Sequence, residues 1–375
     1  MKTIPLMDEF SQWVLQFRTK AMRHGISGLV YDQIMSGVNL DPEVLIKDQY
    51  QPEVRQPIWK YLEKAVTDSR IQDGRAALLA NKATLQRIAS KYGVAQEFIV
   101  AIWGLESAYG KVLGDFPVIQ SLATLANDAR RAGLFETQLI CALKIVQNGD
   151  ISTNELRGSW AGAMGHTQFM PSSFLEHAID FDSDGVRNIW GDDPCDALAS
   201  TAAYLAAAGW LPGGQCLVEI QLTAEFDFAL AGMNHTKPAS EWRKFGVDMA
   251  QPSVETASIL IPAGAKGPAF IAFANFKAIL RYNAAIPYAI AIDQLAERIA
   301  GTKPIALNWP FQDQVMSVAE QRELQQRLTK LGMDTKGVDG IFGPNTFAAL
   351  RRYQTKQGLV AYGYPTREIL MRLRE

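Results

Sequence analysis

The feature that most constrains this chain is an apolar helical stretch, residues 95–110, that carries a single acid near its end. Ile99, Ile102 and Trp103 recur at helical spacing, and Glu106 follows Trp103 by three positions. Residues three and four apart share a helix face, so the carboxyl group of Glu106 belongs to the apolar stripe. Burial there raises the pKa of an acid, which suits a proton donor that works near neutral pH. A Glu that caps the helix or pairs with Lys or Arg is the alternative.

The size and charge of the chain exclude several classes of protein. Its 375 residues suffice for two or three domains, and 48% hydrophobic with 20% charged residues is ordinary for a globular protein. A net charge of −2 gives no basic field for nucleic acid. No apolar run is long enough to span a membrane, and residues 1–16 lack the pattern of a secretory signal. The sequence therefore predicts a cytoplasmic protein or one whose leader is not part of this sequence.

Hydrophobic periodicity predicts a mainly α-helical fold. Successive helical patterns cover residues from 8 to about 90, and the last of these helices is predicted at 71–91. Helical patterns return at 117–148, 197–209 and 275–300. Short runs with strand character predict a small β insertion at about 216–274. The predicted domains are a large helical body at 1–301 that contains this insertion, a Pro-containing linker at 302–314, and a three-helix domain at 315–375.

The three cysteines allow one disulfide. Cys141 lies in an apolar helical run and is expected in the core. Cys195 and Cys216 flank one predicted helix in polar surroundings, and we expect them to pair in an oxidising compartment. No two cysteines are close in sequence, which disfavours zinc.

A second chemical feature is a Gly-rich segment at residues 158–173. Ser159 and Gln168 supply hydrogen-bonding groups, while Met164 and Phe169 supply apolar wall. A sugar site needs this combination of flat apolar surface and a few fixed polar groups. A structural Gly-rich turn packed by Met and Phe is the alternative.

These two stretches together resemble the lytic transglycosylase B family of bacterial cell-wall enzymes. The resemblance lies in Gly-Leu-Glu-Ser at 104–107 and in Gly-Ser-Trp-Ala-Gly-Ala-Met-Gly-x-x-Gln-Phe-Met-Pro-Ser from position 158, and it extends over about 55–300. It implies a lysozyme-like helical core in which Glu106 is the single catalytic acid and base.

The resemblance also assigns substrate contacts. Ser159 and Gln168 fall near the acid and the substrate acetamido group, and His166 stands at the wall or rim where the family often has Tyr. Core packing is the alternative for the tyrosines. Met164 is expected to form apolar wall, and the resemblance implies that two arginines contact the peptide stem. The predicted substrate-binding residues are Ser159, Gln168, Tyr61, Tyr204, Tyr282, Tyr288, Met164, Arg130 and Arg131.

An Asp-rich loop follows. Asp180, Asp182 and Asp184 occupy positions one, three and five of a calcium-loop pattern, and the carbonyl of Val186 comes next. The Glu expected at position twelve is absent, and the resemblance offers Asp196 as the closing ligand. A structural calcium ion and an Asp-rich turn satisfied by its own backbone are both open interpretations.

Residues 315–375 resemble the small helical peptidoglycan-binding domain. Ser317 and Glu320 have the spacing of a capping box, and residues 337–346 form a turn-rich loop before a second helix. A three-helix cap that only stabilises the protein is the alternative.

The resemblance and the lone acid predict the chemistry. Most glycosidases use two carboxylates, whereas one suits substrate-assisted cleavage. We expect non-hydrolytic cleavage of the β-1,4 bond between N-acetylmuramic acid and N-acetylglucosamine, leaving 1,6-anhydromuramic ends without a cofactor. A lysozyme-like hydrolase and a non-catalytic wall-binding protein are the alternatives. Expected partners are glycan strands, peptide stems and other cell-wall enzymes, in a periplasmic location, soluble or associated with the outer membrane.

Overall fold

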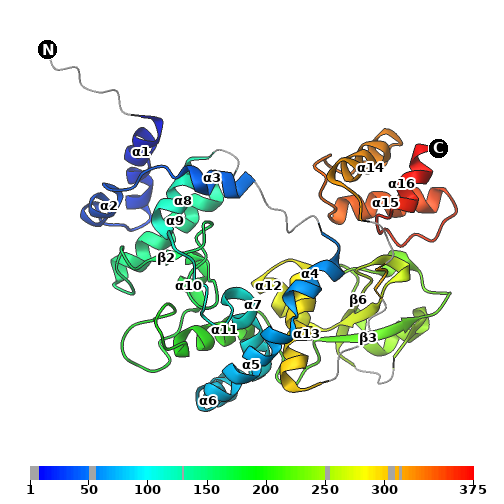
Figure 1. Cartoon of the computed structure of the whole chain (residues 1–375), viewed down its shortest axis with the longest axis horizontal. Helices are drawn as coiled ribbons and strands as arrows, with labels where there is room; N and C mark the ends of the chain where they lie inside the picture. Colours follow the sequence, from blue (N-terminus) through cyan, green and yellow to red (C-terminus); the bar gives the residue numbers. More distant parts are fainter. Residues whose placement is uncertain (1–7, 50–55, 129–130, 250–253, 303–308, 312–314) are drawn as a thin grey trace. The chain divides into compact units, whose positions relative to one another are not determined.

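The computed structural model describes residues 8–49, 56–128, 131–249, 254–302, 309–311 and 315–375. The chain divides into two compact units, and Figure 1 colours it from one end to the other. The first unit comprises Met1–Gln51 and Gln72–Tyr204, and the second comprises Pro52–Ile71 and Leu205–Glu375. Across the described ranges, no helix is both long and apolar enough to cross a membrane.

The first unit is mainly helical. Leu122 and Leu125 of α8 and Leu139 and Leu143 of α9 are buried where these two helices pack together. Its helices are α1 (Glu9–Arg23), α2 (Gly28–Met35), α3 (Pro42–Gln49), α6 (Lys82–Tyr92), α7 (Gln96–Ser107), α8 (Val118–Asn127), α9 (Ala132–Asn148) and α10 (Pro171–His177), while α5 (Asp68–Ala80) and α11 (Cys195–Ala207) each contain a unit boundary.

One long predicted helix is broken in the structure. The pattern at 71–91 predicted a single helix, but α5 ends at Ala80 and α6 begins at Lys82. Asn81 leaves helical geometry with φ −104° and ψ 19°, and its side-chain amide donates to the carbonyl oxygen of Ala77 at 2.9 Å. Asn competes for backbone groups in this way, so an apolar pattern can continue through a turn.

The second unit contains the predicted β insertion. Its antiparallel sheet has the strand order β4-β6-β7-β3-β5, and its core includes Trp242, Ile259 and Phe273. The strands are β3 (Leu217–Leu222), β4 (Lys237–Pro238), β5 (Val247–Asp248), β6 (Thr256–Leu260) and β7 (Ala269–Ala272). The same unit holds α4 (Ile58–Ala65), α12 (Ala274–Tyr282) and α13 (Ile286–Ala300).

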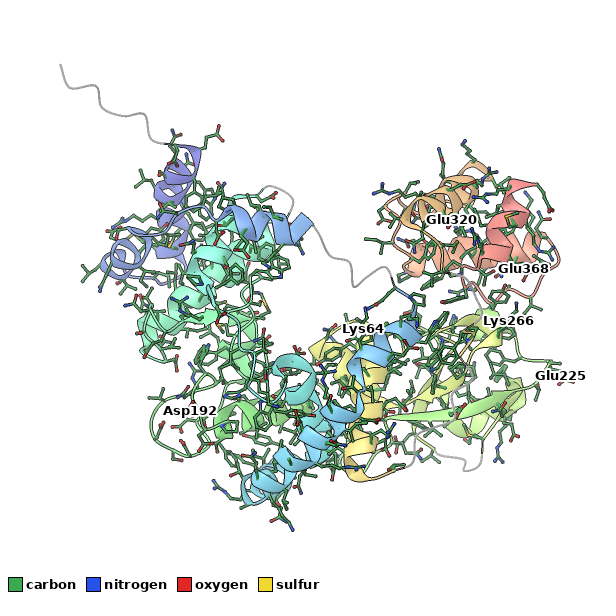
Figure 2. All side chains as sticks on the ribbon, in the orientation of Figure 1. Lys64, Asp192, Glu225, Lys266, Glu320 and Glu368 are labelled. Carbon is green, nitrogen blue, oxygen red and sulfur yellow. The ribbon has the colours of Figure 1, made fainter. Side chains whose placement is uncertain are left out.

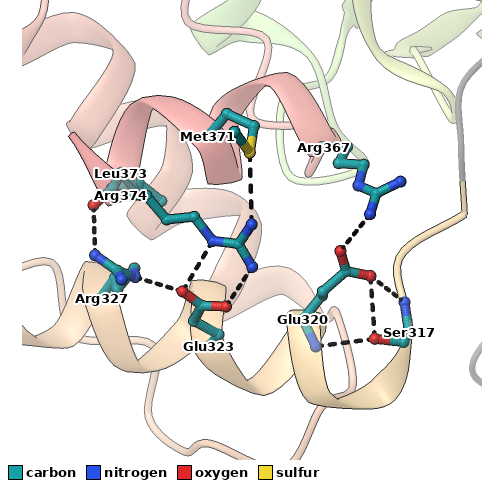
Figure 3. A network of polar contacts seen from close by, with 8 residues as sticks. All are labelled: Ser317, Glu320, Glu323, Arg327, Arg367, Met371, Leu373 and Arg374. Carbon is teal, nitrogen blue, oxygen red and sulfur yellow. Dashed lines mark hydrogen bonds and ion pairs between the residues drawn. The ribbon is translucent and has the colours of Figure 1, made fainter.

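The C-terminal residues form the predicted three helices, α14 (Val318–Lys330), α15 (Pro344–Lys356) and α16 (Arg367–Arg374). The capping box of Ser317 and Glu320 is present. Glu323 joins α14 to α16 by accepting from Arg374 at 2.7 Å, and it also accepts from Arg327 at 2.8 Å (Figure 3). These two partners hold the pKa of Glu323 at about 2. The mainly α fold with a small sheet and a three-helix C-terminal domain is therefore confirmed.

Candidate active site

Glu106 lies in the last turn of α7, and its side chain is half-buried. The helix before it is buried from Phe98 to Gly104. The next residues, Ala108, Tyr109 and Gly110, adopt left-handed backbone with φ of 50°, 61° and 83°. This conformation costs a residue other than Gly about 1–3 kcal/mol. The predicted helix therefore stops three residues early, in a strained reversal that other contacts must hold.

Ser107 holds this reversal from both sides. Its hydroxyl donates to the carbonyl oxygen of His166 at 2.6 Å and accepts the backbone amide of Gly110 at 2.9 Å. Ser107 itself is 1% exposed. In a buried setting such a hydrogen-bonded hydroxyl is costly to lose, so the turn that carries Glu106 has one defined conformation.

The ring of Tyr109 folds back against α7 and fixes the same turn. It meets the Trp103 ring edge-on, with centroids 5.7 Å apart. Gly104 makes room for it, because a Cβ at this position would lie 2.4 Å from the Tyr109 ring. The sequence analysis did not single out Tyr109 or assign a role to Gly104, although a Gly inside an apolar helix is a signal of close approach.

Ser159 begins a tight turn of the Gly-rich segment. Its amide donates to the carbonyl oxygen of Ala163 at 2.8 Å, and its hydroxyl oxygen accepts the amide of Ala163 at 3.0 Å. The side chain is half-buried. No described residue accepts the hydroxyl proton, which leaves Ser159 able to donate a hydrogen bond outward.

Gln168 is held by its side-chain nitrogen. Its backbone has φ 52°, and Nε2 donates to the carbonyl oxygens of Leu113 at 3.1 Å and Gly165 at 2.9 Å. With nitrogen and oxygen assigned from this network, Oε1 occupies the other end of the amide and is available as an acceptor.

The segment that follows Glu106 is attached to the Gly-rich segment at three points. Gly114 allows the closest approach, because a Cβ there would lie 2.2 Å from the carbonyl oxygen of Gly158. The attachments are Ser107 to His166, Leu113 to Gln168, and the antiparallel pair of β1 (Phe116–Pro117) with β2 (Arg157–Gly158). The first unit therefore fixes the Glu106 turn against the segment that carries Ser159 and Gln168.

His166 is buried rather than exposed at a rim. It is 5% exposed, its Nδ1 accepts from the indole N–H of Trp103 at 3.1 Å, and its Nε2 donates to the carbonyl oxygen of Gly191 at 2.6 Å. These partners select the neutral tautomer with the proton on Nε2. His166 and Trp103 also border a cavity of about 390 Å³ within the first unit. Both ring nitrogens are occupied, so His166 acts as a structural link.

Two further predicted contacts are Met164, within the Gly-rich segment, and Tyr204 on α11. Met164 is completely buried and pairs with Phe169 through two backbone hydrogen bonds of 2.8 and 2.9 Å. Its side chain therefore lies in the core of the segment, and its contact with substrate stays a prediction. Tyr204 on α11 is half-buried, and its ring lies 5.9 Å from that of Phe169 and 4.5 Å from that of His177.

The other predicted tyrosines belong to the second unit. Tyr61 lies on α4 and Tyr282 at the end of α12, and both are half-buried. Tyr288 lies in the first turn of α13 and is 5% exposed. Residues 283–285 separate α12 from α13 between these two tyrosines.

Of the two predicted stem-binding arginines, Arg130 lies outside the described residues. Arg131 forms an ion pair with Asp48 of α3, whose side chain is 5% exposed, and its guanidinium also lies 5.0 Å from the Phe135 ring centroid. The charge of Arg131 is therefore already balanced within the first unit.

The Asp-rich loop gathers three of its predicted ligands. Carboxylate oxygens of Asp180, Asp182 and Asp184 lie within 4.8 Å of one another. Asp196 is outside this group, because its two oxygens accept the amides of Phe181 at 2.8 Å and Asn188 at 2.9 Å. Asp196 therefore closes the loop through hydrogen bonds, and its expected place in the ligand group is not realised.

The predicted Cys195–Cys216 disulfide is absent, and all three cysteines are free thiols. The thiol of Cys216 is buried and hydrogen-bonds to the carboxyl group of Asp293 on α13. Burial raises the pKa of Cys216 well above its usual value, and burial likewise raises that of Cys195 to about 11. Protonated, buried thiols are poorly disposed to oxidation.

Comparison with known families identifies the class of protein. Residues 9–297 match the family model of the transglycosylase SLT domain, and residues 317–373 match that of a peptidoglycan binding domain. The chain belongs to the SLT transglycosylase family. The predicted class of enzyme, a lytic transglycosylase, is confirmed.

Individual relatives agree with this assignment. The chain is 33% identical over 291 residues to the membrane-bound lytic murein transglycosylase B of Escherichia coli (strain K12), covering 74% of this chain and 80% of that protein. It is 44% identical to SltB3 from Pseudomonas aeruginosa, solved in complex with NAG-anhNAM-pentapeptide, with a TM-score of 0.92 over 98% of this chain and 100% of that chain. Escherichia coli Slt35, solved in complex with calcium, is 32% identical with a TM-score of 0.67 over 76% of this chain and 92% of that chain. The lysozyme-like transglycosylase fold is thereby confirmed.

Proposed function

We propose that this chain cleaves the β-1,4 bond between N-acetylmuramic acid and N-acetylglucosamine in peptidoglycan without using water. The observation that carries the proposal is the full-length similarity to SltB3, whose bound ligand contains an anhydro-muramic unit. The local structure supports it, since the Glu106 turn is held rigidly against the segment that bears Ser159 and Gln168. Preorganised groups of this kind lower a reaction barrier without rearrangement at the moment of reaction.

Glu106 serves in both halves of the proposed reaction. Its carboxyl group first gives a proton to the bridging oxygen as the bond to the anomeric carbon breaks. The substrate acetamido oxygen then bonds to the anomeric carbon. The ionised Glu106 next removes the proton of the C6 hydroxyl, and O6 displaces the acetamido oxygen to close the 1,6-anhydro ring. The proton returns to Glu106, and no water is consumed.

Ser159 and Gln168 position the acetamido group in this scheme. The Ser159 hydroxyl retains a proton to donate, and Gln168 presents Oε1 as an acceptor for an amide N–H. Tyr61, Tyr204 and Tyr282 are half-buried, and they stay predicted sugar contacts because tyrosine combines an apolar ring with a polar tip. Arg131 is less suited to bind the peptide stem, because it is already in an ion pair with Asp48. Tyr288 is less suited to contact a sugar, because it is buried.

The product ends test this reaction directly. Digestion of purified sacculi in heavy-oxygen water should release muropeptides that end in anhydro-muramic acid, lighter by one water and free of the heavy label. Mass spectrometry measures both properties in one run. Labelled reducing ends would instead establish a hydrolase, and the absence of any soluble product would favour a non-catalytic wall-binding protein.

The proposed substrate places the protein in the periplasm, the compartment that holds peptidoglycan. The C-terminal domain, which matches a peptidoglycan binding domain, would attach the enzyme to the polymer. Association with other cell-wall enzymes stays a prediction.

We also propose that the Asp-rich loop binds a structural calcium ion. Asp180, Asp182 and Asp184 supply converging carboxylate oxygens, and the carbonyl oxygen of Val186 is the fourth candidate ligand. Oxygen ligands of this type suit calcium, and the relative Slt35 was solved with it. The backbone already uses some of these oxygens, for example in the 3.0 Å hydrogen bond from the amide of Gly185 to Asp180.

Calcium should therefore raise the melting temperature of the protein. In differential scanning calorimetry, millimolar calcium should shift the transition upward by about 2–4 °C for each kcal/mol of binding free energy. Asp182→Asn should abolish the shift, whereas Asp192→Asn, an exposed acid outside the group, should retain it. An identical melting temperature with calcium and with a chelator would contradict the site.

A further inference from the structure

A cavity in the second unit has none of the predicted site residues in its walls. Its volume is about 820 Å³. One part of the wall comes from the start of α4, the end of β6 and the α12–α13 junction, and another comes from the C-terminal helices. Representative wall residues are Trp59, Ile261, Pro287, Phe347, Arg351 and Tyr364.

The C-terminal domain contacts the turn after β6 through Tyr364, which is one of the wall residues of this cavity. A Cβ on Gly264 would lie 2.7 Å from Cβ of Tyr364, so the turn after β6 presses directly on the C-terminal domain. Beside it Lys266 forms a 3.6 Å ion pair with Glu368, and Figure 2 labels both residues. The cavity is therefore a composite site to which the C-terminal domain contributes walls.

The permanent charges in the wall of this cavity are all positive. Among the described residues, its walls include neither Asp, Glu nor Lys, and the guanidinium groups of Arg351 and Arg367 are the permanent charges. Arg367 is balanced by Glu320 at 2.9 Å. Arg351 has no ion-pair or hydrogen-bond partner among the described residues, although its side chain is half-buried and burial lowers its pKa.

The position of Arg351 is constrained by its neighbours. Gly363, with φ +71°, lies against it, and a Cβ there would approach Nη1 of Arg351 to 3.0 Å. The amide of Gly363 is in turn fixed by a 2.7 Å hydrogen bond to Oε1 of the buried Gln354. A guanidinium keeps its charge at any physiological pH, so a half-buried one without a partner favours an incoming anion.

We propose that this cavity binds the free carboxyl terminus of a peptidoglycan peptide stem, with Arg351 pairing with the carboxylate. The planar fork of Arg matches a carboxylate in two parallel hydrogen bonds. The aromatic and proline walls accept the methyl groups of the alanine residues that end such a stem. The identity of the peptide rests on the proposed function, and the relative SltB3 was solved with a pentapeptide-bearing ligand.

Titration calorimetry on the full-length chain tests this pairing. The probe is the N-acetylated stem pentapeptide without sugar, compared with the same peptide carrying a C-terminal amide. The wild-type chain should bind the acid at least about tenfold more tightly than the amide, because a charged hydrogen-bond pair is lost. Arg351→Gln should remove this preference by weakening the acid alone.

Arg352→Gln is the matched control, because it removes the same charge from the next residue. Arg352 is exposed, and its guanidinium donates to the carbonyl oxygen of Asp334 at 3.1 Å. This variant should keep the preference for the acid. Equal binding of acid and amide by the wild-type chain, or an equal loss in both variants, would overturn the proposal.

A second assay separates this inference from the proposed function. Glycan strands stripped of their peptides should be cleaved equally by the wild-type chain and by Arg351→Gln. If neither cleaves them and the wild-type chain still prefers the peptide acid to the amide, the proposed reaction fails on these strands while the carboxylate site stands. If both cleave them and the peptide acid does not bind, the reaction stands and the carboxylate site is excluded.

Discussion

Glu106→Gln should reduce the release of soluble muropeptides from sacculi by at least about a thousandfold, the scale of general acid–base catalysis. The amide has nearly the shape of the acid, but it cannot give a proton to the bridging oxygen or take one from the C6 hydroxyl. Because the proposed reaction uses the same group twice, both steps are lost together. The rate is measured by chromatography of soluble products over time.

Glu97→Gln provides the control on the same helix. Glu97 lies in the first turn of α7, far along the helix from Glu106, and carries the same change of charge. Its activity and melting temperature should stay close to those of the wild-type chain. Retention of substantial activity by Glu106→Gln would remove the acid from the mechanism and favour a different catalytic group.

Asp293→Asn should stabilise the second unit at neutral and higher pH. Asp293 is 2% exposed, and burial raises its pKa from 3.8 to about 7. The folded chain therefore holds a proton that the unfolded chain releases above pH 4. The favourable contribution of this proton is present below the unfolded pKa and is lost as the pH rises to about 7. Above that, the buried charge costs on the order of 4 kcal/mol.

The variant removes this pH dependence. Near pH 8 its melting temperature should exceed that of the wild-type chain by several degrees, and near pH 4 the two should agree. Circular dichroism melts at a series of pH values give the comparison. Asp248→Asn, at an exposed position on β5, should follow the wild-type chain at every pH. A constant difference across the range would show that Asp293 does not titrate in this window.

The sequence predicted the elements whose apolar patterns are strong and local. The helices around Glu106, the strands at 217–222, 256–260 and 269–272, and the capping box at Ser317 all appear in the structure. Local patterns determine such elements because burial of one face and capping of one end depend on neighbouring residues. The half-buried position of Glu106 follows from the same argument.

Features that depend on distant residues were beyond the sequence. The predicted disulfide is absent, and the hydrogen bond between Cys216 and Asp293, which lies on another element, was not predicted. Met164 looked like a wall residue, but its backbone pairing with Phe169 turns it into the core. The role of Ser107 depends on the carbonyl group of His166, and the cavity around Arg351 needs residues from α4, the sheet and α15. Spacing along the chain contains no signal for such long-range partners.

The interleaved order of the two units has a consequence for biosynthesis. The apolar face of α4, with Ile58, Trp59 and Leu62, packs in the second unit, and one of its partners is α13. A ribosome makes α13 long after α4, on the order of ten seconds or more at usual elongation rates. During that interval α4 emerges without its cover. We therefore expect the nascent chain to depend on chaperones that bind exposed apolar segments. We also expect that no single cleavage of the chain yields two fragments that fold independently.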